Sequence, residues 1–267
     1  MTLWPYGGSE SGLGGMSCLV PQPNGTQGSC VDGRERRSPT APNAVLLDIG
    51  MTVVHPDGHK LLAHAAHARP GYTADPEDLA RALCLASSAS HWPLPRVGGV
   101  ERVARVWSAL VDLRPMEGLQ TLQACFQDDD FYSEMEPDLR DTLKRLRAGD
   151  RRLAAITNST RPVRDELERL GISDLFDAAV DSTAVGISKP KAGIFAACLA
   201  ELRLEPGACW FVGDDNVGDI LGAWAAGFGR VVLLDRAAAF EGLPWPVRIK
   251  RLSQLPNLLE GNDDLAA

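Results

Sequence analysis

The chain has 267 residues, of which 45% are hydrophobic and 23% are charged, and its formal net charge is −8. These values are typical of a globular protein with one or two domains and a sizeable apolar core. The negative charge argues against general nucleic-acid binding, which needs lysine and arginine to neutralise phosphates. The sequence contains no apolar run long enough to span a membrane, and its N-terminus lacks the pattern of a signal peptide.

The six cysteines are scattered along the chain, and none of them forms a Cys-x-x-Cys pair. A chain of this length, with this supply of apolar residues, does not need a disulfide framework. We therefore predict reduced thiols and a cytoplasmic location.

Residues 1–42 differ in composition from the rest of the chain. They are rich in glycine, serine and proline and show no periodic apolar pattern. Such a segment cannot bury enough surface to offset the entropy of ordering it. We predict a disordered N-terminal extension.

Beyond this segment, apolar runs bounded by turn residues predict buried strands at residues 44–49, 153–156, 178–180, 209–212 and 231–234. Apolar residues at helical spacing predict a helix after each of the runs at residues 153–156, 178–180 and 209–212. The first begins near Val163, the second begins near Pro190, and the third ends at Gly227. Another helix is predicted from Pro137 to its stop at Gly149. Alternating strands and helices indicate an α/β fold with a parallel sheet covered on both faces.

The stretch between about Lys60 and Asp130 is different, because it contains helical patterns and no convincing strand. Asp75 followed by Pro76 is a good helix start. Val103 and Trp107 belong to an apolar pattern with helical spacing. We predict a helical insertion between the first strand and the rest of the sheet.

Ligands of parallel sheets bind beyond the carboxyl ends of the strands, so the residues that follow each strand are the candidates for chemistry. Each of these segments alone is an ordinary turn or helix cap, but together they offer carboxylates, a hydroxyl, an amide and a lysine at one edge. This set of groups is suited to binding a phosphoryl group with a divalent metal. The candidate residues are Asp48, Thr157, Asn158, Lys189, Asp214, Asp215 and Asp219.

These segments, in this order and on these elements, resemble the four sequence motifs of the haloacid dehalogenase superfamily. The resemblance runs from about Ala44 to Leu259 and implies a three-layer, Rossmann-like parallel sheet with an inserted α-helical cap domain. It places the catalytic core at residues 43–58 and 132–260 and the cap at residues 59–131. The phrases that carry the resemblance are Ala155-Ile156-Thr157-Asn158, Ser188-Lys189-Pro190, and Gly213-Asp214-Asp215 with Asp219.

The resemblance also implies roles for the candidate residues. Asp48 is expected to attack phosphorus and form an aspartyl-phosphate, which water then hydrolyses. Thr157, Asn158 and Lys189 are expected to bind the phosphoryl oxygens, with Lys189 also neutralising charge on the nucleophile. The implied Mg²⁺ ligands are Asp48, the backbone of Gly50, Asp214, Asp215 and Asp219, where Asp219 is expected either to bind the metal or to orient Lys189.

Gly50 departs from the family pattern, because most phosphatases of the family have a second aspartate two residues after the nucleophile. That aspartate acts as general acid and base, help that is typically worth about a hundred- to ten-thousand-fold in rate. One interpretation is a phosphatase whose substrate has a good leaving group, or which uses another acid such as His55 or His59. A second is dehalogenase or phosphonoacetaldehyde hydrolase chemistry, and a third is a weak enzyme or a binding protein.

On the first interpretation, the substrate is a small phosphorylated metabolite, since a cap encloses the site and limits access for macromolecules. Sugar phosphates, phosphoglycolate-like acids and nucleotides are all compatible with the sequence. Neither a nucleic acid nor a membrane is expected as a partner, and the sequence leaves the oligomeric state open.

Overall fold

The computed structural model describes residues 41–91, 97–159, 161–242 and 247–261. The predicted N-terminal extension lies outside the described residues, except for its last two positions. The described elements all belong to one compact unit. Among them there is no helix with both the length and the apolar character needed to cross a membrane.

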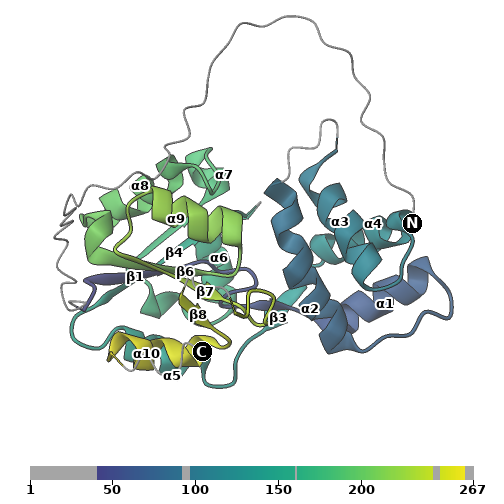
Figure 1. The fold of residues 1–267 in the computed structure, drawn as a ribbon, viewed down its shortest axis with the longest axis horizontal. Helices are drawn as coiled ribbons and strands as arrows, with labels where there is room; N and C mark the ends of the chain where they lie inside the picture. Colours follow the sequence, from purple (N-terminus) through teal and green to yellow (C-terminus); the bar gives the residue numbers. More distant parts are fainter. Residues whose placement is uncertain (1–40, 92–96, 160, 243–246, 262–267) are drawn as a thin grey trace, which may run out of the picture. The chain divides into compact units, whose positions relative to one another are not determined.

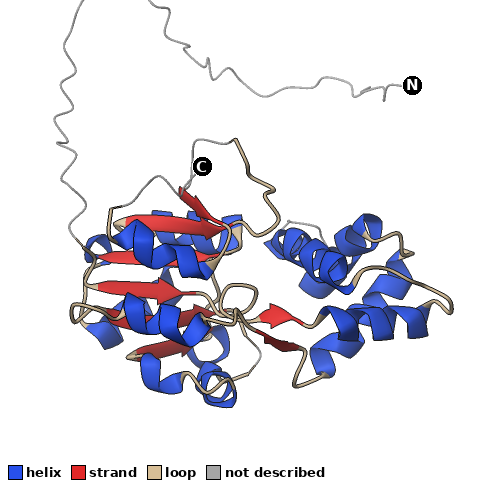
Figure 2. Cartoon of the chain, turned by 90° about the horizontal axis from the view of Figure 1, so that it is seen from below, coloured by secondary structure: helices blue, strands red, loops and turns tan. Residues whose placement is uncertain are grey.

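The core is a six-stranded sheet in which every neighbouring pair is parallel, with the order β5–β4–β1–β6–β7–β8 (Figures 1 and 2). Five of these strands confirm the predicted ones. The sixth, β8, was not predicted, because it has three residues and only the last is buried. In chain order the strands are β1 (Ala44–Leu47), β4 (Arg152–Thr157), β5 (Ala178–Asp181), β6 (Cys209–Gly213), β7 (Arg230–Leu234) and β8 (Val247–Ile249).

Helices cover both faces of this sheet and make the three layers (Figure 2). Because successive side chains of a strand point to opposite faces, Val45 and Leu47 pack in one apolar cluster and Ala44 and Leu46 in the other. The first cluster includes α5 (Leu139–Leu146), α6 (Val163–Arg169) and α10 (Leu255–Leu259). The second includes α8 (Ala192–Leu202) and α9 (Gly222–Ala225).

Shorter segments complete this part of the chain. The predicted helix before Gly227 begins as a π-helical segment, η4, and continues as α9. In chain order, these shorter segments are η2 (Ser173–Leu175), α7 (Ser182–Val185), η3 (Pro206–Ala208), η4 (Asn216–Leu221) and η5 (Leu252–Gln254).

The predicted helical insertion is present between β2 (His55–Pro56) and β3 (Tyr132–Glu134), two short strands that pair antiparallel. Its helices have an apolar cluster of their own, in which Trp107 is fully buried and donates a 3.0 Å hydrogen bond to the Leu79 carbonyl. The insertion therefore has its own core. Its helices are α1 (Gly58–Ala68), α2 (Pro76–Ser87), η1 (Ser88–His91), α3 (Gly99–Leu110) and α4 (Pro115–Gln127).

The predicted helix start at Asp75 and Pro76 is confirmed. The Asp75 side chain accepts hydrogen bonds from the backbone N–H groups of Glu77 and Asp78, at 2.8 and 3.3 Å, and Pro76 occupies the first helical turn. The strands β2 and β3 were not predicted, because two or three residues are too few to show a period.

Candidate active site

A cavity of about 430 Å³ lies at the carboxyl edge of the central strands. Strand β1 leads to Asp48, β4 ends in Thr157, and β6 ends at Gly213, directly before Asp214. Because β1 lies between β4 and β6, the three strands deliver their polar residues to the same place. The cavity has the size of a small-molecule site.

Lys189 is the centre of this cavity's polar network. Its side chain is buried, and its Nζ lies 2.5 Å from Asp48 Oδ1, 2.6 Å from Asp219 Oδ1 and 3.1 Å from the Ile156 carbonyl oxygen. Burial alone lowers the pKa of Lys189, but Asp219 and Asp48 outweigh it and the net pKa is raised. The ammonium group therefore stays charged, with all three of its hydrogens donated.

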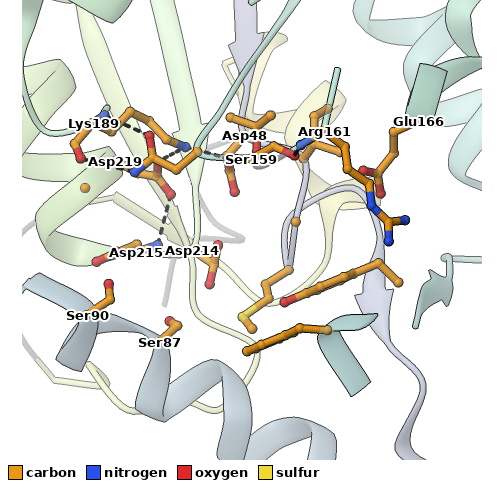
Figure 3. A pocket seen from close by; sticks show the side chains of 18 of the residues that line it. Asp48, Ser87, Ser90, Ser159, Arg161, Glu166, Lys189, Asp214, Asp215 and Asp219 are labelled. Carbon is orange, nitrogen blue, oxygen red and sulfur yellow. Dashed lines mark hydrogen bonds and ion pairs between the residues drawn. The ribbon is translucent and has the colours of Figure 1, made fainter. Parts of the chain in front are cut away.

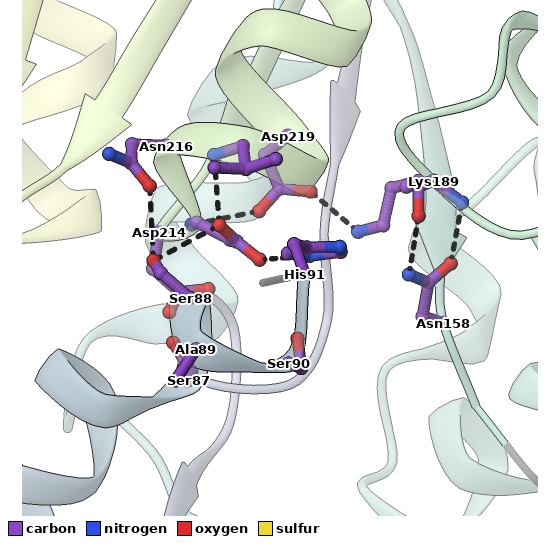
Figure 4. A network of polar contacts seen from close by, with 12 residues as sticks. Ser87, Ser88, Ala89, Ser90, His91, Asn158, Lys189, Asp214, Asn216 and Asp219 are labelled. Carbon is purple, nitrogen blue, oxygen red and sulfur yellow. Dashed lines mark hydrogen bonds and ion pairs between the residues drawn. The ribbon is translucent and has the colours of Figure 1, made fainter. Parts of the chain in front are cut away.

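Asn158 fixes the backbone of Lys189 on the other side. Its Nδ2 donates to the Lys189 carbonyl at 3.1 Å, and its Oδ1 accepts from the Lys189 N–H at 2.8 Å (Figure 4). This reciprocal pair ties the loop before α8 to the end of β4, 31 residues earlier. The predicted Asn158 thus contacts Lys189 directly and lines the cavity with Thr157.

Three carboxylates converge beside the lysine. Among the described residues, Asp48, Asp214 and Asp219 offer oxygens that all lie within 4.8 Å of one another. Thr52 Oγ1 lies 3.2 Å from Asp214 Oδ1 and 3.5 Å from Asp48 Oδ2, and so bridges two of them. Gly213 makes the approach possible, since a Cβ there would lie 2.2 Å from Asp219 Oδ2.

These carboxylates repel one another at low solvent exposure. Burial, and then the charges of Asp219 and Asp48, raise the pKa of Asp214 well above its ordinary value. Burial also raises the pKa of Asp219, although Lys189 opposes this. A carboxyl group in such surroundings is stabilised as an anion by a nearby cation, and Mg²⁺ prefers oxygen ligands. This donor set fits a divalent metal.

Asp215 is placed differently from the other predicted metal ligands, because its carboxylate contacts the helical insertion. Its Oδ2 lies 2.6 Å from His91 Nε2, and its Oδ1 lies 3.2 Å from Ser88 Oγ and 2.9 Å from the Val217 N–H. Asp215 is therefore outside the group of three carboxylates. Sequence reasoning gave His91 and Ser88 no specific role.

Gly50 lines the cavity, and its surroundings show that glycine is not required there. Its φ angle is not in the left-handed region, and a Cβ would have only Tyr132 Cε1 within 4 Å, at 3.9 Å. The left-handed residue of this turn is Met51, with φ 64°. A Cβ at position 50 would thus meet only an ordinary van der Waals contact.

The structure does not support His55 or His59 as the substitute acid. Both line a second cavity, and neither lines the cavity that holds Asp48. His91 is the histidine that lines the Asp48 cavity among the described residues. Nothing in the local sequence marks it, because its partner Asp215 is 124 residues away.

The remaining walls carry groups of both signs. Figure 3 shows Ser87 and Ser90 facing the acidic cluster from the insertion, with Arg161 and Glu166 at the opposite side of the cavity. Arg161 forms an ion pair with Asp129. Burial raises the pKa of Glu166. These side chains were not singled out from the sequence.

A family model described as haloacid dehalogenase-like hydrolase matches residues 42–227. The chain belongs to the haloacid dehalogenase-like hydrolase family. The match covers every strand end that borders the cavity, so the resemblance of the four motifs to this family is confirmed.

Named relatives of this hydrolase include several phosphatases. A ribulose-1,5-bisphosphate 5-phosphatase of Halopiger xanaduensis is 36% identical over 36% of this chain and 41% of its own length. An N-acylneuraminate-9-phosphatase of Rattus norvegicus is 31% identical over 49% of this chain and 54% of its own. The matched segments thus span about half or less of these relatives.

Solved structures agree on the fold. A phosphatase of the same superfamily from Thermococcus onnurineus aligns over 82% of this hydrolase and 98% of its own chain, with a TM-score of 0.53 and 23% identity. At this identity the likeness concerns the fold alone.

Proposed function

We propose that the protein is a Mg²⁺-dependent phosphatase that acts on a small phosphorylated metabolite through an aspartyl-phosphate on Asp48. The observation that carries the proposal is the position of Lys189 between Asp48 and Asp219, with Asp214 beside them. A carboxylate nucleophile and a phosphate are both anions, and they react only where fixed positive charge offsets their repulsion.

Asp48, Asp214 and Asp219 are the side chains that would hold the metal, and Gly50 is its candidate backbone ligand. The bound metal supplies Lewis-acid polarisation of the phosphoryl oxygens. Asp215 belongs to the predicted ligands as well, but its contacts with His91 and Ser88 favour a different role, which is developed below.

The other groups of the cavity have roles in the same displacement. An Asp48 carboxylate oxygen forms a bond to phosphorus while the bond from phosphorus to the leaving oxygen breaks, and the ammonium of Lys189 offsets the charge. Thr157 and Asn158 border the place of the phosphoryl oxygens. A water molecule then attacks phosphorus, which releases inorganic phosphate and restores the Asp48 carboxylate.

Protonation of the leaving oxygen is the weak point of the site, because Gly50 supplies no acid. We propose that the leaving alkoxide takes its proton from water, so that the wild type hydrolyses alkyl phosphates slowly. The helical insertion serves as a cap, since Ser87 and Ser90 line the cavity together with Asp48. A cavity of about 430 Å³ suits a metabolite rather than a macromolecule.

The named relatives narrow the substrate class. Those phosphatases act, by their names, on ribulose 1,5-bisphosphate and N-acylneuraminate 9-phosphate. A glyceraldehyde 3-phosphate phosphatase of Methanothermobacter thermautotrophicus is also similar, with 36% identity over 36% of this chain. These names favour a phosphorylated sugar or sugar acid.

The alternatives have less support. Phosphonoacetaldehyde hydrolase chemistry needs a lysine from the insertion, but the chain has none between Lys60 and Lys144. Lys60 pairs with Asp128 at 2.9 Å and does not line the cavity of Asp48. Dehalogenase chemistry needs no metal, and it leaves the converging carboxylates without a purpose.

The test is a screen of small phosphate esters with Mg²⁺, with a chelator, and with the Asp48→Asn variant. We expect phosphate release from sugar phosphates that requires Mg²⁺ and Asp48. Release of halide from 2-haloacids in the presence of chelator would instead show a dehalogenase. A folded wild-type protein that binds phosphate esters and turns over none would be a binding protein.

A further inference from the structure

The contacts between η1 and the loop after β6 carry an inference about how the cavity closes. Ser88 and His91, at the two ends of η1, both contact Asp215, which lines the cavity of Asp48. Ser88 Oγ also lies 3.1 Å from Asn216 Oδ1. Two segments that are more than 120 residues apart thus meet through these side chains, of which His91 and Asp215 line the cavity of Asp48.

Each partner of this contact is held in place from its own side. The Val217 N–H donates to Asp215 Oδ1 at 2.9 Å, so Asp215 also caps the π-helical segment that follows it. On the insertion side, Arg102 of α3 donates to the backbone carbonyls of Ala89 and Ser90. The Asp215 and His91 side chains are only 16% and 18% exposed.

Gly218 leaves room for the approach. A Cβ at this position would lie 3.0 Å from His91 Nε2 and 3.1 Å from Asp215 Oδ2. Such distances are tighter than ordinary van der Waals contact, so a side chain at 218 would push the imidazole away from the carboxylate.

The same contacts engage the oxygens of Asp215. Its Oδ1 accepts from Ser88 or the Val217 N–H, and its Oδ2 pairs with His91. Asp214, by contrast, has a single hydrogen-bonded partner among the described side chains, the Thr52 hydroxyl, and it belongs to the converging carboxylates. The two adjacent aspartates therefore differ in their surroundings: Asp215 contacts the insertion, and Asp214 belongs to the carboxylate group.

We propose that His91, Ser88 and Asp215 form a latch that holds the helical insertion closed over Asp48, and that Asp215 is a positioning residue rather than a metal ligand. Opening the latch separates η1 from the loop after β6 and gives a small substrate its way in and its product a way out. The latch concerns the closing of the cavity, and its physical tests do not require that the proposed phosphatase activity be correct.

Breaking the latch should raise local opening by a measurable factor. A hydrogen bond to a charged group contributes enough stability that its loss shifts the closed-to-open ratio by about ten-fold or more. Hydrogen–deuterium exchange with mass spectrometry measures this shift in peptides that cover residues 88–91 and 216–221. We expect faster exchange in both peptides for His91→Ala and for Gly218→Ala, which wedges the pair apart without deleting a polar group.

Two matched controls lie in the same insertion. His67→Ala removes an exposed histidine of α1, and Gly99→Ala adds a methyl whose nearest neighbour is 3.8 Å away. Both should exchange like the wild type in these peptides. His91→Gln, which keeps an N–H donor, should restore part of the protection. Unchanged exchange in folded His91→Ala and Gly218→Ala proteins would overturn the latch.

Calorimetric titration of the protein with Mg²⁺ alone tests the second half of the proposal. Asp215→Asn should bind Mg²⁺ nearly as well as the wild type, whereas Asp214→Asn should bind it much more weakly. An equal loss in the two variants would make Asp215 a ligand and overturn its assignment as a positioning residue. A wild type that binds no Mg²⁺ would contradict the proposed function, and the exchange experiment would then decide the latch on its own.

Discussion

His55 makes the stability of this protein depend on pH in a window that can be stated in advance. Both of its ring nitrogens are buried and have no hydrogen-bond partner among the described residues. Burial, and then the positive charge of Arg236, lower the pKa of His55 from 6.5 to about 3. The folded protein therefore keeps a neutral imidazole, while His55 of the unfolded chain takes up a proton as the pH falls below the ordinary histidine pKa of 6.5.

The free energy of unfolding must decrease as the pH is lowered through this window, because the unfolded state binds more protons than the folded state between the two pKa values. The contribution is fully present above the unfolded pKa and is lost as the pH drops toward the folded one. Since one pKa unit corresponds to about 1.36 kcal/mol, lowering the pH from about 8 to about 5 should cost about 2 kcal/mol at His55 alone.

Urea unfolding of the wild type and His55→Gln across this pH range measures the effect. Other titrating groups act in both proteins and cancel in the difference. We expect the stability of the wild type relative to the variant to fall by about 2 kcal/mol between the two ends of the range. His59→Gln, which replaces an exposed histidine four positions later, is the control. Parallel curves for the wild type and His55→Gln would refute the reasoning.

Three further changes probe the active site. Lys189→Met leaves two buried carboxylates without their cation, so urea unfolding should show a loss of about 3–5 kcal/mol, and a loss below 1 kcal/mol would contradict the charge pairing. Asp214→Asn should weaken Mg²⁺ binding strongly, and a chelator should stop wild-type turnover. Equal Mg²⁺ affinity of the variant and the wild type by calorimetry would exclude Asp214 as a metal ligand. Gly50→Asp has room for its Cβ and should melt normally. Relative to the wild type, its rate of alkyl phosphate hydrolysis should rise by about ten-fold or more over any rise for aryl phosphates. An equal change for the two classes would refute the idea that the site lacks a general acid.

The sequence contained enough local information to predict the sheet and the cluster at its edge. Buried runs such as residues 44–47 and 209–213 are visible because both faces of a parallel strand are apolar. The position of Lys189 beside Asp48 follows from the parallel sheet, since the carboxyl ends of its strands share one edge. Strands β2, β3 and β8 were missed, because two or three residues show no period.

What the sequence could not show are contacts that depend on how distant segments pack. The pairing of His91 with Asp215 has no local signal in the sequence. Because of this pairing, the Asp215 carboxylate contacts the insertion and is not part of the group formed by Asp48, Asp214 and Asp219. The environment of His55 is another case, because its place in the second cavity depends on the path of the β2–β3 ribbon. Whether Gly50 tolerates a side chain also needed the φ angle and the position of Tyr132.

The central claim is that Asp48 attacks phosphorus, and trapping the covalent adduct tests it most directly. The protein is mixed with Mg²⁺ and the best substrate of the ester screen, quenched in acid within the first turnover, digested and analysed by mass spectrometry. We predict one added phosphoryl group on the peptide that contains Asp48, and none in the Asp48→Asn variant. Turnover by a correctly folded Asp48→Asn protein, or a phosphoryl group on a different residue, would contradict the account.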